Sequence, residues 1–247
     1  MLFTIEDFRK TFVDSEDAAL RLRNQLTELV NQDTTLKSHR DWIEANHYGL
    51  GERCFHYLWK MLVDEMPVFF RFLEIGVHCG QVPSLIGLLA ENAGKRCEVY
   101  GVSPFTGVGM HDHPVDYESI TKFVWSYWCN TDSLRLIRGY SNDPLVVSKV
   151  RDCCDQPGFR IVYIDGGHDS DIVRSDLLNY SQFVKVGGYL LTDNSANRFR
   201  QPFGFFQGME SVSRAVDELL PPFGSGLPGQ WEHLGAIVHL RLFRRLS

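Results

Sequence analysis

The chain has 247 residues, which is enough for one large domain, or one domain with an appendage, around a sizeable hydrophobic core. Its 44% hydrophobic and 23% charged residues are ordinary for a globular protein and argue against a disordered chain or a coiled coil. The formal net charge of -6 comes without a long basic run, so we expect no nucleic-acid partner.

The N-terminus and the cysteines bear on the cellular compartment. Glu6 and Asp7 interrupt the apolar core that a signal peptide needs, and no apolar run approaches the ~18 residues of a membrane helix. The six cysteines are scattered without a C-x-x-C pair, which is typical of reduced thiols. We therefore expect a soluble, cytoplasmic protein without a membrane partner.

Residues 1–66 are expected to form a helical N-terminal extension. Residues 15–32 begin with Ser15 and two acids, and their leucines recur at roughly helical spacing. A further helix is expected over 52–65, ending before Pro67, with an apolar stripe that is more typical of core packing than of a ligand site. We expect the extension to cap a substrate pocket, beside a sheet that is complete without it, and to support a homodimer.

From residue 67 onward, short apolar runs alternate with segments of helical length. The expected strands are 68–76, 97–103, 134–139, 159–165 and 187–193, and the expected helices are 81–93, 115–130, 143–154 and 169–185. This alternation predicts an α/β domain over 67–247 with a doubly wound, mostly parallel sheet. Residues 231–243 complete a seven-stranded sheet with an antiparallel edge, and residues 194–208 are expected to form a loop or lid.

The first strand ends in a glycine-containing turn. Glu74, Gly76, His78 and Gly80 lie at its carboxyl end, where ligands bind in doubly wound sheets. Gly76 permits a sharp turn and Gly80 a closely packed helix, but the spacing is not the G-x-G-x-x-G of nicotinamide or flavin enzymes. The pattern favours a cofactor loop, with a plain tight turn as the alternative.

The second and third strands end in serines. Ser103 stands where a nucleoside-binding fold usually has a carboxylate for the ribose hydroxyls, and a hydroxyl binds them more weakly. Ser141 could border an adenine ring. Ser141, Asn142 and Asp143 would serve equally well as the N-cap of the next helix.

The fourth and fifth strands end in side chains suited to a metal ion. Asp165 ends one strand, and Asp193 and Asn194 end the next. Adjacent parallel strands bring these oxygens to one rim of the sheet, and two carboxylates with an amide oxygen form a site of the kind that Mg²⁺ prefers. Capping of the loops by Asp and Asn is the alternative.

Two histidine motifs lie in expected loops. His168 follows Asp165 by three residues, and an imidazole is well suited to accept a proton near neutral pH, so His168 is a candidate general base. A solvated loop histidine is the alternative. The His111-Asp112-His113 motif could bind a transition metal, but a solvated loop is the better reading of that segment.

Four stretches of the sequence resemble class I S-adenosylmethionine-dependent methyltransferases, over roughly residues 68–245. They are FLEIGVHCGQVPSLI, VYGVSPFTG, IVYIDGGHDSDIVRSDL and VGGYLLTDN. Within that family the chain is similar to the cephalosporin hydroxylase-like and macrocin-type O-methyltransferase branch, and more distantly to catechol O-methyltransferase.

The resemblance implies site residues. It implies metal ligands at Asp165, Asp193 and Asn194, and catalytic roles for Asp165 and for His168 as the base. The cofactor residues that it implies are Glu74, Gly76, His78, Gly80, Ser84, Ser103, Ser141 and Asp165. Ser103 departs from the family pattern, which has an acid at that position.

The resemblance also implies an activity. The expected reaction is methyl transfer from S-adenosylmethionine to a hydroxyl of a small molecule, either a sugar or a catechol-like diol, assisted by Mg²⁺ or another divalent cation. Two alternatives stay open: a cephalosporin hydroxylase-like metal enzyme on the same scaffold, and a non-catalytic cofactor-binding module.

Overall fold

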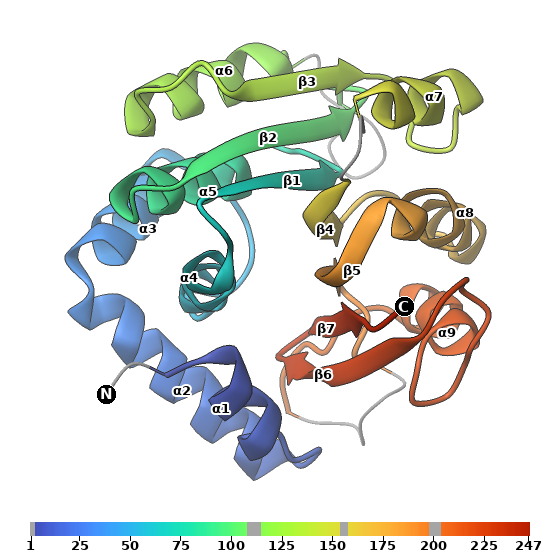
Figure 1. Cartoon of the computed structure of the whole chain (residues 1–247). Helices are drawn as coiled ribbons and strands as arrows, with labels where there is room; N and C mark the ends of the chain where they lie inside the picture. The colour runs from blue at the N-terminus through green and yellow to red at the C-terminus, as the bar shows by residue number, and fades with distance from the viewer. Residues whose placement is uncertain (1–2, 108–114, 154–157, 198–203) are drawn as a thin grey trace.

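A computed structural model describes residues 3–107, 115–153, 158–197 and 204–247. These residues form a seven-stranded sheet in the order β3-β2-β1-β4-β5-β7-β6, in which β7 alone runs in the direction opposite to the other six strands (Figure 1). The strands are β1 (Phe69–Ile75), β2 (Arg96–Ser103), β3 (Leu134–Arg138), β4 (Phe159–Ile164), β5 (Val184–Thr192), β6 (Trp231–Ile237) and β7 (Leu240–Arg245). The expected doubly wound, mostly parallel sheet is confirmed.

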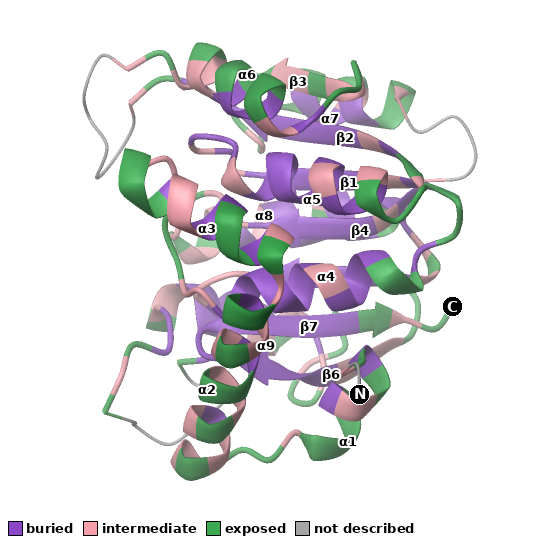
Figure 2. Ribbon diagram, turned by 90° about the vertical axis from the view of Figure 1, so that its left-hand side faces the viewer, coloured by how far each residue is buried: buried purple, intermediate pink, exposed green. Residues whose placement is uncertain are grey.

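Helices cover both faces of the sheet. They are α1 (Ile5–Thr11), α2 (Glu16–Gln32), α3 (Thr34–Asn46), α4 (Phe55–Glu65), α5 (Gln81–Asn92), α6 (Tyr117–Trp128), α7 (Pro144–Asp152), α8 (Ser170–Tyr180) and α9 (Glu210–Leu219). Figure 2 shows α3, α4 and α5 in front of a largely buried sheet. Among the described residues, no helix combines the length and the apolarity that a membrane crossing requires.

The strands alternate between two hydrophobic clusters, one on each face. In β4, Ile161 and Tyr163 belong to the cluster that contains α4 and α5, whereas Val162 and Ile164 belong to the cluster that contains α7, α8 and α9. This period of two is what a strand buried on both faces requires. By the same alternation, Asp165, two residues beyond Tyr163, continues the α4 side.

The carboxyl ends of the central strands meet at one rim. Ile75 of β1 lies beside Ile164 of β4, and Ile164 lies beside Thr192 of β5. Asp165 and Asp193, which directly follow the last two of these residues, are therefore neighbours in space although 28 positions separate them in sequence.

The N-terminal helices share the core of the sheet. Thr4 and Ser15 cap α1 and α2 through side-chain hydrogen bonds, as the sequence predicted for Ser15. Trp59 of α4 is 2% exposed and packs edge-on against Phe72 of β1 and Tyr163 of β4. The division of the chain at residue 66 stays a prediction. All seven strands come from residues after 66, so the sheet itself is complete without the preceding residues, but α4 forms part of one of its two covering layers.

Other expected boundaries shift by a few residues. The helix expected over 169–185 ends as a short 3₁₀ turn at Ser181–Phe183, and β5 begins at once with Val184. Helix α9 was not predicted. The described part of the expected loop 194–208 contains an isolated bridge between Ser195 and Gly208. The described cysteines are all free thiols: Cys54, Cys79, Cys97, Cys129 and Cys153.

Candidate active site

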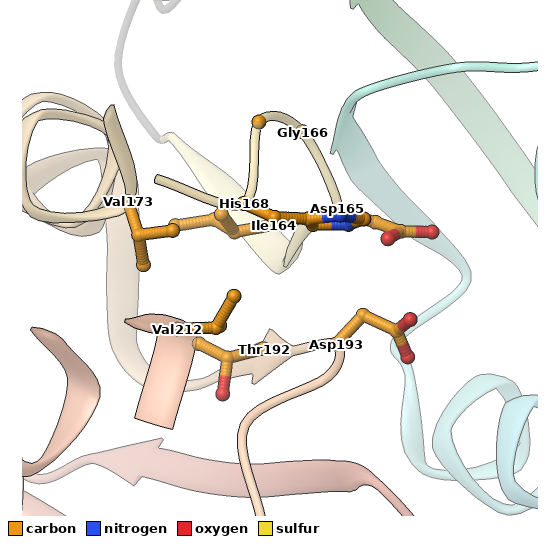
Figure 3. Close-up of a pocket in the computed structure, with 9 residues that line it drawn as sticks. Ile164, Asp165, Gly166, His168, Val173, Thr192, Asp193 and Val212 are labelled. Carbon is orange, nitrogen blue, oxygen red and sulfur yellow. The ribbon is translucent and has the colours of Figure 1, made fainter. Parts of the chain in front are cut away.

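The centre of the site is a pair of acids, Asp165 and Asp193, which we call the acid pair. The backbone N–H of Asp165 donates to the carbonyl of Ile75 (2.8 Å), and that of Asp193 donates to the carbonyl of Ile164 (3.0 Å), so the hydrogen-bond ladder of the sheet fixes both residues. Figure 3 shows both carboxylates extending to the same side, away from Val173 and Val212. The expected meeting of these two side chains at the rim is confirmed by the geometry.

The acid pair lies in a strongly unfavourable environment for negative charge. Burial raises the pKa of Asp165 well above its ordinary value, and the nearby carboxylates of Asp193 and Glu74 raise it further. Burial also raises the pKa of Asp193, although His239 opposes the rise. Burial and the charge of Asp193 both raise the pKa of Glu74. Three acids at one rim therefore favour a cation or shared protons.

Each member of the acid pair faces a donor that the sequence did not single out. The Tyr163 hydroxyl donates a hydrogen bond to Oδ2 of Asp165 (3.0 Å). Nε2 of His239, in the turn between β6 and β7, lies 3.6 Å from Oδ1 of Asp193. That oxygen is buried and has no hydrogen-bond partner among the described residues.

His168 and Asn194 contact each other at the edge of the acid pair. Nδ2 of Asn194 lies 3.1 Å from Nε2 of His168. Asn194 adopts a left-handed backbone conformation (φ 51°), which turns the chain sharply after β5. The Ser211 hydroxyl donates to the carbonyl of His168 (2.7 Å) and thereby ties the loop after β4 to α9. The candidate base and the candidate ligand of the metal are thus joined in one unit.

The glycines of the loop after β1, which is the expected cofactor loop, are required by the backbone conformation and by close packing. Gly76 has φ 98°, and a Cβ there would lie 1.9 Å from the carbonyl oxygen of Asp165, so no other residue fits. Gly80 has φ 86° and begins α5, where a Cβ would meet Thr121 of α6 at 2.9 Å. The loop is therefore packed directly against the acid pair on one side and α6 on the other.

The remaining residues of the loop differ in exposure. Glu74 is 4% exposed, and its Oε2 has no hydrogen-bond partner among the described residues. His78 is partly exposed, and its ring lies 4.8 Å from that of Tyr117. A buried, unpaired carboxylate oxygen beside a glycine turn is well placed for a polar, positively charged part of a ligand.

Ser84 was expected at the cofactor, but the structure gives it another role. Its side chain is fully buried in α5, where Oγ lies 3.0 Å from Nε2 of His39 and donates to the carbonyl of Gln81 (3.1 Å). Its hydroxyl is already satisfied within the contact of α3 with α5. We therefore remove Ser84 from the candidate cofactor residues.

Ser103, the last residue of β2, and Ser141, which follows β3, lie at the same rim. The Ser103 hydroxyl accepts a hydrogen bond from the backbone N–H of Phe105 (3.4 Å). The Ser141 hydroxyl faces Asp176 of α8, and its carbonyl accepts a hydrogen bond from Tyr180 (2.7 Å). Asp143 is the N-cap of α7, so the interpretation of this segment as a helix N-cap is correct for Asp143. Contacts of Ser103 and Ser141 with a cofactor stay predictions.

A cavity of about 10 Å³ lies behind the acid pair, lined by residues that include Ile164, Val173, Thr192 and Val212. This volume holds about one water molecule, so the cavity is not a substrate pocket. Within the described ranges, no group of three or more His, Cys, Asp or Glu side chains could hold a metal ion. The His111-Asp112-His113 motif lies outside the described residues.

Comparison with known families identifies the segment that carries this rim. Residues 73–195, from β1 to just beyond β5, match the model of a family described as a methyltransferase domain. The chain carries a methyltransferase domain. The matched segment contains the glycine loop after β1, the acid pair, His168 and Asn194. The expected class I S-adenosylmethionine-dependent methyltransferase is thereby confirmed. No curated protein matches the chain significantly.

Solved structures support the methyltransferase fold at low sequence identity. An S-adenosylhomocysteine-bound methyltransferase of Podospora anserina, PaMTH1, has a TM-score of 0.59 and 14% identity, with 91% of this chain and 95% of that chain covered. The calicheamicin methyltransferase CalS11 has a TM-score of 0.57 and 16% identity, with 95% of each chain covered. The O-methyltransferase NovP has a TM-score of 0.54 and 17% identity, with 78% and 80% covered.

Proposed function

We propose that the chain transfers a methyl group from S-adenosylmethionine to a hydroxyl of a small molecule, assisted by a divalent cation. The observation that carries this proposal is the acid pair, which stands beside His168 at the rim of a methyltransferase domain. A methyltransferase needs a donor site and an acceptor site at one rim, and the central strands offer both.

The donor would lie over the glycine loop. Gly76 and Gly80 leave the backbone of the loop bare of side chains, and the unpaired Oε2 of Glu74 could accept the ammonium group of the methionine moiety. Ser103 would meet the ribose, with a single hydroxyl in place of a carboxylate. Reactant positioning then supplies most of the rate, since in-line attack on the methyl group needs little else.

Two carboxylates and one amide oxygen, rather than three acidic or histidine side chains, would be the protein ligands of a divalent cation. Burial raises the pKa of both Asp165 and Asp193, and the carboxylate of Asp193 raises that of Asp165 further. One oxygen of Asp193 is also buried without a hydrogen-bond partner among the described residues, so a cation would stabilise the charges of the acid pair. Asn194 would add its amide oxygen, and water would complete the shell. When bound, the cation would stabilise the negative charge that develops on an acceptor oxygen.

His168 would take the proton of the acceptor hydroxyl. In the tautomer in which Nε2 of His168 accepts from the Asn194 amide, 3.1 Å away, that nitrogen carries the lone pair that would accept the proton. An acceptor hydroxyl that replaces this amide would be placed to give up its proton. The Asn194 amide would thus keep the His168 ring in position until the acceptor hydroxyl takes its place.

We propose a sugar hydroxyl as the first acceptor class to test and a catechol-like diol as the second. One structurally similar protein, covered over 95% of this chain, is described as a TDP-rhamnose 3'-O-methyltransferase. Several others are described only as O-methyltransferases. We also propose that the N-terminal helices border the acceptor and support a homodimer.

The proposal is tested with S-adenosylmethionine labelled in its methyl group and a panel of nucleotide sugars, free sugars and catechols. We expect label transfer to one class, loss of transfer with a chelator, and recovery with Mg²⁺. Asp165→Asn and Asp193→Asn should abolish transfer and keep most of the affinity for S-adenosylhomocysteine. Asp171→Asn is the matched control, because that carboxylate is 97% exposed. Full transfer in the chelated sample would rule out a catalytic cation.

A further inference from the structure

The Tyr163 hydroxyl, the His239 imidazole and helix α4 lie behind the acid pair, and we call the first two its donors. The Tyr163 hydroxyl bonds to Asp165 at 3.0 Å, and Nε2 of His239 approaches Asp193 to 3.6 Å, which is within ion-pair distance and beyond a normal hydrogen bond. Tyr163 comes from β4 itself. His239 reaches the rim because β7 pairs antiparallel with β5, with Thr192 opposite Arg241, and because the backbone N–H of Ser195 donates to the His239 carbonyl (2.8 Å).

Helix α4 packs against both donors through one aromatic stripe. Phe55 and Trp59 are four residues apart and therefore lie on the same side of the helix. The ring of Phe55 meets His239 edge-on, with centroids 4.9 Å apart, and the ring of Trp59 meets Tyr163 in the same way at 5.0 Å. Edge-to-face contacts of this kind fix ring orientation as well as position.

We propose that Tyr163 and His239 are positioning residues, one for each member of the acid pair, and that Phe55 and Trp59 hold them in place. The inference rests on the proposed function, since it assigns these residues to the site where the cation would bind. Neither donor lies at the position of a ligand or of the base. Each acts through the carboxylate that it faces.

The physical argument concerns the orientation of two like charges. Two crowded carboxylates without donors would turn apart or take up protons. A donor behind each one offsets that tendency and leaves the remaining oxygens aimed at a common point. Groups behind metal ligands typically change metal affinity or activity by about 10–100-fold when they are removed.

Tyr163→Phe tests the first donor, because it removes one hydroxyl and keeps the ring against Trp59. The matched control is Tyr100→Phe in β2, which removes a hydroxyl 3.3 Å from the carboxylate of Glu98, outside the site. We expect Tyr163→Phe to weaken Mg²⁺ binding to the S-adenosylhomocysteine complex by about 10–100-fold in calorimetry. Tyr100→Phe should leave Mg²⁺ affinity unchanged, and both should keep the affinity for S-adenosylhomocysteine.

His239→Leu and His239→Gln test the second donor. Leucine removes the donor, whereas the glutamine amide nitrogen can reach the position of Nε2, so His239→Gln should restore most of the Mg²⁺ affinity that His239→Leu loses. His233→Leu is the control on the same hairpin, since His233 packs against Phe12 and Phe243. In turnover, His239→Leu should lower kcat and leave KM for S-adenosylmethionine unchanged.

Mg²⁺ affinities of Tyr163→Phe and His239→Leu equal to that of the unaltered protein would overturn the inference. If the unaltered protein binds no divalent cation, the cation in the proposed function fails instead, and crystal structures then decide the inference. Carboxylates of Asp165 and Asp193 that turn away in the two variants would support positioning without a metal. Carboxylates that stay in place would overturn it.

Discussion

Asp176 is an acid buried where the loops after β3 and β4 meet. It is 1% exposed, its Oδ2 lies beside Gly166, and burial raises its pKa to about 7, with the Ser141 hydroxyl acting in the opposite direction. An unfolded aspartate loses its proton near pH 3.9. Between that pH and about 7, the folded chain therefore binds more protons at this residue than the unfolded chain.

This difference predicts a pH dependence of stability. Because the folded pKa is raised, the contribution of Asp176 is fully present below about pH 4 and is lost as the pH rises through about 7. Asp176→Asn should remove this loss. As the pH rises through this window, the free energy of unfolding of the variant should therefore increase relative to that of the unaltered protein, by up to about 1.4 kcal/mol per pH unit. Urea unfolding of both proteins at several pH values measures the gain. A difference that does not vary with pH would contradict it.

His168 allows a separate prediction on catalysis. Replacing it with alanine removes the proposed base and leaves both carboxylates of the acid pair, so His168→Ala should bind Mg²⁺ and S-adenosylhomocysteine normally. Its turnover should fall by about 10²–10⁴-fold. The loss should shrink at high pH, where the acceptor hydroxyl ionises without help. An equal loss at every pH would point to a role of His168 in binding rather than in proton transfer.

Sequence alone predicted the residues of the site that stand directly at strand ends. Asp165 and Asp193 could be paired because parallel strands place their carboxyl ends at one rim. His239 could not be predicted, because it reaches Asp193 only through the antiparallel register of β7 on β5, and no motif encodes that register. Ser84 was misplaced because α5 turns it towards His39, and that orientation depends on α3, which no spacing in the sequence relates to α5.

At the scale of elements, α4 is the helix whose loss should matter most. Trp59 fills the space between α4 and the sheet, so Trp59→Ala should lower the free energy of unfolding by about 3–5 kcal/mol. Lys60→Ala, at the next position, removes a partly exposed ion pair with Asp64 and should cost about 1 kcal/mol at most. Denaturant unfolding measures both. A small loss for Trp59→Ala would mean that α4 is a loosely attached cap after all.

The strands were predictable because each is an apolar run between turns. The start of β5 was missed because the helix expected over 169–185 included Val184 and Lys185, although the strand runs from Val184 to Thr192. Helix α9 was missed because it follows a Gly- and Phe-rich segment that favours a loop. In the structure its Val212, Ala215 and Val216 are buried against the face that also holds α8. This tertiary contact stabilises the helix.

At the scale of the whole molecule, both halves of the proposed reaction converge on one rim of one sheet. The glycine loop after β1 would hold the donor, the residues after β4 and β5 would hold the acceptor, and α4 supports the second group from the buried face. The N-terminal helices and the matched domain share a hydrophobic cluster, so the chain is expected to unfold as one cooperative unit.

The contact of Gly76 with Asp165 has a kinetic consequence. The two loops touch through their backbones with no room for even one methyl group, so a shift of either loop displaces the other. The chain should therefore follow a compulsory order of addition, with S-adenosylmethionine entering first and setting the rim before the acceptor can bind. In steady-state measurements, S-adenosylhomocysteine should compete with S-adenosylmethionine, and an unreactive acceptor analogue should inhibit uncompetitively with respect to S-adenosylmethionine. A random order would show that the two loops relax separately.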